Sequence, residues 1–261
     1  FLFRIGLQNL ILQSGVPMLI GAIDFEDKLP GSATPPGMTN SALFFNHRGR
    51  LRHKYDKIHR VPYGEYIPFR RCLPGFIVRM IDMNRDLVPG ADYNPIEVRS
   101  DVRAGTAICY EGVFGYLTRE FARRGANVLV VLSNDAWYPK SSEPEQHLAN
   151  ATLRAVETGL PMVRCGNNGG SLVVTPYGRI TQVLTVDGPE QRPELRRGRG
   201  VKTLAVGVEP SPSYTFYVRH GEWFIAVLAA VEAVFWLAAF AGFKKRKQAL
   251  LDAIRRPGAG S

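Results

Sequence analysis

Cysteine is scarce in this chain of 261 residues, with only Cys72, Cys109 and Cys165 present. An odd and sparse set of cysteines is not a disulfide framework. No Cys-x-x-Cys pair occurs, and this argues against a structural zinc site. The sequence therefore predicts neither a metal nor another cofactor, and it leaves the redox compartment open.

The chain also lacks a basic stripe interleaved with aromatic residues. Its formal net charge is +10, but the cations gather late, at 192–199, 244–247 and 255–256. Proteins that bind single-stranded nucleic acid alternate such cations with rings on which bases stack. Nucleic acid is therefore not expected as a partner. A hydrophobic content of 45% with 21% charged residues is that of an ordinary globular domain.

An initiator methionine and a signal-peptide pattern are both missing, because the chain opens Phe1-Leu2-Phe3-Arg4. We therefore expect an N-terminally truncated fragment. Apolar spacing predicts a helix near residues 1–14 and a buried strand over 16–24. Two further strands, 41–46 and 51–55, are expected to form a hairpin. Residues 67–95 lack periodicity and are expected to be a long functional loop or insertion.

The second half of the chain alternates strand and helix patterns. Strands are expected at 106–109, 127–133, 162–165, 171–175, 179–186 and 204–208, and helices at 113–124 and 144–158. The run Asn127–Ser133 is continuously apolar, which is typical of a strand buried on both faces. Such alternation predicts an α/β sheet layer.

A single long hydrophobic run lies near the end of the sequence. Residues 223–243 carry one charge, Glu232. At about 1.5 Å per residue they can cross a hydrocarbon core roughly 30 Å thick. The basic run 244–247 follows, and the positive-inside rule places it in the cytoplasm with the large domain on the other side. A buried core helix is the alternative, and Glu232 is expected to face a partner helix.

These patterns divide the chain into four parts. We expect a catalytic domain over 1–210, a linker over 211–222, a transmembrane helix over 223–243 and a basic cytoplasmic tail over 244–261.

Cys109 ends an apolar strand just before a helix, at the kind of strand end where α/β sites form. Backbone N–H groups at the helix start are expected to lower its pKa and to bind an oxyanion. The alternative is a small buried hydrophobic residue.

Lys57 and Glu65 flank a turn that contains Pro62 and Gly64, which can aim both side chains at one place. A lysine stabilises a thiolate and neutralises developing negative charge. A carboxylate can act as a base or hold the lysine. A solvated charged turn is the alternative.

Polar residues follow the apolar strand that ends at Ser133. Among them Asn134 and Trp137 are expected to line a site, with capping of the next helix as the alternative. His147 is expected on the helix surface or behind the site, because no other histidine has metal-ligand spacing with it.

Four segments carry a family resemblance, in the order YDKIHRVPYGEY, TAICYEG, LSNDAWY and RCGNNGGSLVVTPYGRI. Together they resemble the nitrilase, or carbon–nitrogen hydrolase, superfamily. The particular residues in these segments are similar to those of the membrane branch of this superfamily, the bacterial apolipoprotein N-acyltransferases. A membrane helix directly after the domain also fits that branch. The resemblance covers roughly residues 10–245.

The resemblance implies a four-layer α-β-β-α sandwich. Cys109 would be the nucleophile, Lys57 the lysine of a Glu-Lys-Cys triad and Glu65 an additional essential glutamate. Tyr110 and Glu111 match the two residues that follow the nucleophile in the family.

The implied reaction belongs to lipoprotein maturation at the bacterial inner membrane. An acyl chain would pass from a phospholipid, through a thioester on Cys109, to the amine of an S-diacylglyceryl-cysteine lipoprotein. The domain would face the periplasm.

The sequence departs from the family pattern at two places. The triad glutamate is expected before Phe1, because Asp24, Glu26 and Asp27 do not match its motif; the fragment alone is therefore expected to be inactive. Tyr138-Pro139 replaces the commoner Phe-Gly. Two alternatives stay open: a membrane-tethered amidase that gives its acyl group to water, and a non-catalytic membrane-anchored binding module.

Overall fold

The computed structural model describes residues 2–26, 37–81, 86–135, 141–167, 170–184 and 203–255. The chain forms two compact units, Phe1–Arg219 and His220–Ser261. The first contains both sheets and the second a single long helix.

The first unit begins with α1 (Leu2–Ser14) and a sheet of three antiparallel strands in the order β1-β2-β3. The strands are β1 (Met18–Phe25), β2 (Met38–Phe45) and β3 (Leu51–Asp56). The expected helix and hairpin are therefore confirmed. Gly49, in the tight connection between β2 and β3, has a φ of +65°, a conformation that glycine adopts without steric cost.

A second sheet has six strands in sequence order, β4 to β9. They are β4 (Ile96–Arg99), β5 (Val102–Ile108), β6 (Val128–Ser133), β7 (Met162–Gly166), β8 (Leu172–Val174) and β9 (Ile180–Val183). The central strands β5, β6 and β7 are parallel and the outer pairings are antiparallel. The expected α/β layer is confirmed.

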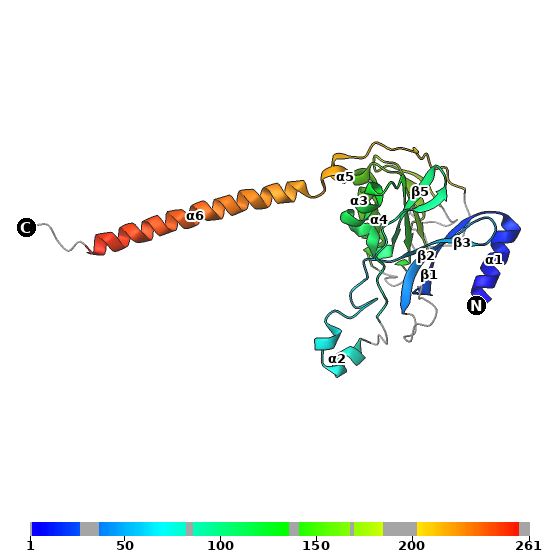
Figure 1. Ribbon diagram of the computed structural model, residues 1–261, viewed down its shortest axis with the longest axis horizontal. Coiled ribbons are helices and arrows are strands. Elements are labelled where there is room, and N and C mark those ends of the chain that lie inside the picture. Colours follow the sequence, from blue (N-terminus) through cyan, green and yellow to red (C-terminus); the bar gives the residue numbers. More distant parts are fainter. Residues whose placement is uncertain are drawn as a thin grey trace, which may run out of the picture. The chain divides into compact units, whose positions relative to one another are not determined.

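The helices that follow the parallel strands are short 3₁₀ helix η2 (Cys109–Val113), α3 (Gly115–Arg123) and α4 (Glu143–Thr158). Figure 1 shows α3 and α4 on one side of the six-stranded sheet and β1 to β3, with α1, on the other. This is the layer order helix, sheet, sheet, helix that the resemblance implied.

The core lies between these layers. Phe121 of α3 is fully buried, and its ring meets that of Tyr55 from β3 edge-on, with centroids 5.6 Å apart. Ala107 and Leu129 of the central strands are each 1% exposed. Strand β5, which leads into Cys109, is therefore held between an apolar helix face and the three-stranded sheet.

The expectation that β1 is buried is wrong. Ile23 and Phe25 are 57% and 54% exposed. Within the described residues β1 pairs only with β2, so one edge and part of one face have no covering element.

Two other segments differ from expectation. The stretch 67–95 contains 3₁₀ helix η1 (Arg70–Cys72) and α2 (Gly75–Met80), two short helices. Residues 204–208 form no strand. There the Gln182 side chain hydrogen-bonds the backbone of Ala205. Its Nε2 donates to Ala205 O over 2.5 Å, and its Oε1 accepts from Ala205 N over 2.9 Å.

The expected linker 211–222 is largely packed on the first unit. The Tyr214 hydroxyl donates to Ala126 O over 3.0 Å, and Val218 in α5 (Phe216–His220) is 2% exposed. These contacts extend the compact unit to Arg219, past the expected boundary at 210.

The second unit consists mainly of α6 (Trp223–Arg255). Trp223–Asp252 is long and apolar enough to cross a membrane, and its apolar 18-residue window has a mean hydropathy of 2.3. The helix continues beyond 243 through the basic run 244–247. The Trp236 indole N–H donates to Glu232 Oε1 over 3.4 Å, so this charge has a partner on its own helix.

Gly90 offers a test of how the loop after α2 fixes Lys57. Its N–H donates to Lys57 O over 2.9 Å, and a Cβ at this position would lie 2.1 Å from Asp56 O. Because that contact is with backbone, Gly90→Ala must displace one of the two segments, and we expect a loss of about 1–3 kcal/mol in the free energy of unfolding. Thermal unfolding of the detergent-solubilised chain measures this. Gly75→Ala, where a Cβ meets open space, is the matched control; equal stability of the two variants would contradict the prediction.

Candidate active site

Cys109 stands at the junction of β5 and η2 with a φ of +53°. Left-handed backbone at a residue other than glycine costs on the order of 1–3 kcal/mol and gathers at functional sites. The adjacent parallel strand β6 ends at the same sheet edge. There the Ser133 hydroxyl and the Asn134 backbone N–H hydrogen-bond the Cys109 thiol.

Burial raises the pKa of the Cys109 thiol above its usual value. The charge of Lys57 and the neighbouring Ser133 hydroxyl and Asn134 backbone oppose this rise without overcoming it. The expected lowering of the thiol pKa is therefore wrong: desolvation of the thiolate outweighs its favourable neighbours. The thiol needs a proton acceptor before it can attack.

Lys57 is buried, with 1% of its side chain exposed. Its Nζ lies 2.9 Å from both carboxylate oxygens of Glu65. Glu65 also accepts from Asn40 Nδ2 and from Val61 N, each over 2.8 Å. The solvated-turn alternative is therefore wrong, and Glu65 fixes the lysine beside the thiol.

Glu111 is completely buried, and four donors converge on its carboxylate. The backbone N–H groups of Ile58, His59 and Ile108 donate over 2.7, 2.9 and 2.8 Å, and the Tyr55 hydroxyl donates over 3.0 Å. One carboxylate thus fastens the turn that carries Cys109 to the loop that follows Lys57. Burial raises the Glu111 pKa to about 7, although these donors oppose the shift.

Asp135, just after β6, is a buried carboxylate on another side of the thiol. Its Oδ2 accepts from Arg164 Nη2 over 2.7 Å, and its Oδ1 accepts from the Ser133 hydroxyl. Burial alone would raise the Asp135 pKa, but His147, Arg164 and Ser133 hold it well below its usual range. Asp135 is therefore an anion at neutral pH.

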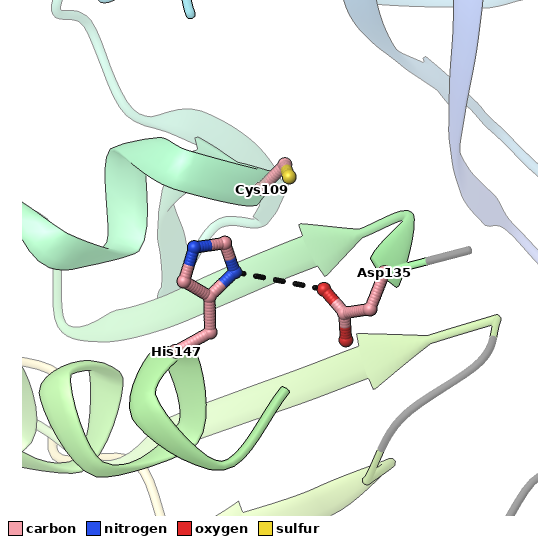
Figure 2. Close-up of side chains that lie close together, drawn as sticks. All are labelled: Cys109, Asp135 and His147. Atoms are coloured by element: carbon pink, nitrogen blue, oxygen red, sulfur yellow. Dashed lines mark ion pairs between the residues drawn. The ribbon is translucent and has the colours of Figure 1, made fainter. Parts of the chain in front are cut away.

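His147 projects from α4 toward the same place. Its Nδ1 lies 2.6 Å from Glu143 Oε1 and 3.6 Å from Asp135 Oδ1, with 13% of the side chain exposed. Figure 2 shows the imidazole, the Asp135 carboxylate and the Cys109 thiol facing one another. The structure places His147 at the site.

The remaining expected site residues lie close by. The Tyr110 ring is 4.9 Å from that of Phe114 and 6.2 Å from that of His147, between centroids. The Asn134 side chain accepts from Asn167 Nδ2 over 2.8 Å. Trp137 lies outside the described residues.

Sequence reasoning did not single out Asp135, Arg164 or Tyr55. The polar run after β6 was a signal for Asp135, and the spacing of Glu143 and His147 on one helix face was a signal for the histidine. Nothing in the pattern marked Arg164 as the partner of Asp135, because that contact joins the middle of β7 to the residues that follow the neighbouring strand β6.

The chain belongs to the carbon-nitrogen hydrolase family, whose model matches residues 4–190. That match agrees with the fold.

The similar proteins include two bacterial apolipoprotein N-acyltransferases. The one from Brucella suis biovar 1 is 36% identical over 223 residues, which cover 83% of this chain and 38% of the relative. The one from Geobacter metallireducens is 33% identical over 207 residues, covering 77% and 36%. The chain thus spans less than half the length of these relatives. A carbon-nitrogen hydrolase from Helicobacter pylori G27 is similar in structure, with a TM-score of 0.49 and 18% identity over 70% of this chain and 62% of that one.

Removing the Glu65 carboxylate tests the buried ion pair. Glu65→Ala leaves the Lys57 ammonium without its partner in a buried position, so we expect unfolding to become easier by about 3–5 kcal/mol. The control is Asp101→Ala, which breaks the pair of Arg99 and Asp101, both at least half exposed. That change should cost no more than about 1 kcal/mol. Similar losses in the two variants, measured by chemical denaturation, would show that burial of Lys57 is not the cause.

The raised pKa of Glu111 should make the folding stability of the chain depend on pH. Between about pH 4.5 and 7 the folded chain binds more protons at this residue than the unfolded chain does, so stability falls as pH rises through this window. Glu111→Gln removes this titration. We expect the loss of stability between pH 4.5 and 8 to be smaller in Glu111→Gln than in the wild type. Glu97→Gln, on the exposed side of β4, should keep the wild-type slope; the idea fails if Glu111→Gln also keeps it.

Proposed function

We propose that the chain carries the nucleophile of an apolipoprotein N-acyltransferase. The enzyme would move an acyl chain from a phospholipid to the α-amine of an S-diacylglyceryl-cysteine lipoprotein. The observation that carries the proposal is the strained Cys109 turn, with a buried lysine acting on its thiol, in a chain 36% identical to a relative of that name.

In the first half-reaction the Cys109 sulfur attacks the ester carbonyl of the donor. A C–S bond forms, the ester C–O bond breaks, and the lysophospholipid leaves with a proton. Negative charge on the carbonyl oxygen is stabilised by Lys57 and by the backbone N–H of Tyr110. Glu65 keeps the ammonium in place, and Glu111 keeps the turn in place.

In the second half-reaction the lipoprotein amine attacks the thioester. A C–N bond forms, the C–S bond breaks and the thiol is restored once the amine has lost a proton. Because burial disfavours the thiolate, a base has to serve both steps. The family resemblance expects a glutamate in that role, and this sequence has none at a matching position. Tyr110 and Asn134 would line the site.

A lipid donor explains why such a domain should be joined to a membrane helix. The α6 helix is long and apolar enough to span a bilayer, and Lys244 to Lys247 follow its apolar part. The positive-inside rule then supports a bacterial inner-membrane location with the first unit in the periplasm.

A radiolabelled phospholipid tests the proposal. Membranes containing the protein expressed from its full reading frame are incubated with a donor labelled in its acyl chain, and the adduct is challenged with neutral hydroxylamine. We expect a labelled, hydroxylamine-sensitive thioester in the wild type, none in Cys109→Ser, and at least a hundredfold less in Lys57→Met, because the oxyanion loses a charged donor.

Cys165→Ser is the matched control, since Cys165 is a free, exposed cysteine on β7, and it should label like the wild type. Label that persists in Cys109→Ser would refute the proposal. Adding a diacylglyceryl peptide with a free amine should discharge the thioester as an amide. Discharge to free fatty acid regardless of the amine would instead identify an amidase-like hydrolase.

A further inference from the structure

Three different metal-ligand types converge beside the nucleophile. The Cys109 sulfur, an Asp135 oxygen and an imidazole nitrogen of His147 all lie within 4.8 Å of one another. They come from η2, the end of β6 and α4, three segments that the parallel sheet brings together (Figure 2). The sequence predicted no metal, because it has no Cys-x-x-Cys pair and no other histidine has metal-ligand spacing with His147.

From this arrangement we infer that Cys109, Asp135 and His147 bind one divalent transition-metal ion, with Zn²⁺ the best match. The ion would bond the sulfur as the thiol proton leaves to solvent, and would thereby block the nucleophile. The inference goes beyond the proposed acyl transfer: it assigns the site an inhibitory ligand.

The distances suit a small ion. Zinc bonds sulfur at about 2.3 Å and nitrogen or oxygen at about 2.0–2.2 Å, so tetrahedral ligand atoms lie roughly 3–4 Å apart. His147 Nδ1 and Asp135 Oδ1 already stand 3.6 Å apart. Side-chain movements of about 1 Å would bring the three ligand atoms to bonding distance of one ion.

One ligand is already fixed in place. Asp135 is fully buried, and Arg164 holds its Oδ2 at 2.7 Å, which directs Oδ1 toward His147. A carboxylate oriented in this way by a hydrogen bond on its other oxygen is the usual outer-shell arrangement of metal sites.

The local charge also favours a dication. Asp135, Glu143 and a metal-bound thiolate supply three negative charges around the imidazole. Of the two nearby cations, Arg164 forms an ion pair with Asp135, and Lys57 forms one with Glu65. Glu143 Oε1, 2.6 Å from His147 Nδ1, is placed to become a fourth ligand once that nitrogen carries no proton.

The donor set selects the metal. Thiolate and imidazole favour Zn²⁺, Co²⁺ and similar ions over Mg²⁺ and Ca²⁺, which prefer oxygen alone. Co²⁺ is therefore a useful probe, because a cobalt–thiolate bond has a charge-transfer band in the near ultraviolet.

Titration of the purified, detergent-solubilised chain with Co²⁺ tests the site. We expect one ion per chain with a sulfur-to-cobalt band, loss of that band in Cys109→Ser, and at least about tenfold weaker binding in His147→Ala. His53→Ala, which removes a histidine on β3, should bind like the wild type. No band, a band that survives Cys109→Ser, undiminished affinity in His147→Ala, or loss in His53→Ala would each overturn the assignment.

A second measurement uses internal controls and needs no activity. Zn²⁺ should protect Cys109 from iodoacetamide while the exposed Cys72 and Cys165 of the same molecule stay reactive, as followed by peptide mass spectrometry. Protection should be lost in His147→Ala at the same zinc concentration. Equal alkylation of Cys109 with and without zinc would refute the site, whether or not the chain transfers acyl groups.

Discussion

The carboxylate of Glu111 is the constraint on which the site depends. Backbone N–H groups are donors only, so the three that converge on Glu111 require an acceptor at that point. Two of them belong to the loop after Lys57 and one to the strand that leads into Cys109. The position of the thiol relative to the ammonium is therefore set by one buried acid, and neither segment can move without leaving a buried donor unpaired.

The site holds several features that oppose folding. Cys109 has a left-handed backbone, Lys57 is buried as an ion, and burial penalises the Glu111 carboxylate. The apolar layers on both sides stabilise these features. Phe121 and Tyr55 pack across the gap between helix and sheet, and the Tyr55 hydroxyl at the same time donates to Glu111. Core packing and site geometry thus share a side chain.

The sequence predicted what local pattern determines. Alternating apolar runs located the central strands, and the motifs around Lys57 and Cys109 located the residues that the fold brings together. Contacts between distant segments were out of reach: the ion pair of Asp135 with Arg164 depends on strand order, and the facing of His147 depends on the path between β6 and α4. The predicted direction of the Cys109 pKa shift was also wrong, because the depth of burial is a property of the whole fold.

Burial of Cys109 acts differently on a thiolate and on a thioester at this position. The thiolate is charged, so desolvation raises its free energy and slows attack unless a base and Lys57 assist. A thioester at the same position carries no charge and so escapes the larger penalty that burial places on an ion. In the proposed acyl transfer, the site would therefore favour the acylated over the ionised state of Cys109, relative to an exposed cysteine. Burial of the thiol would accordingly favour holding an acyl group until an amine arrives over rapid ionisation.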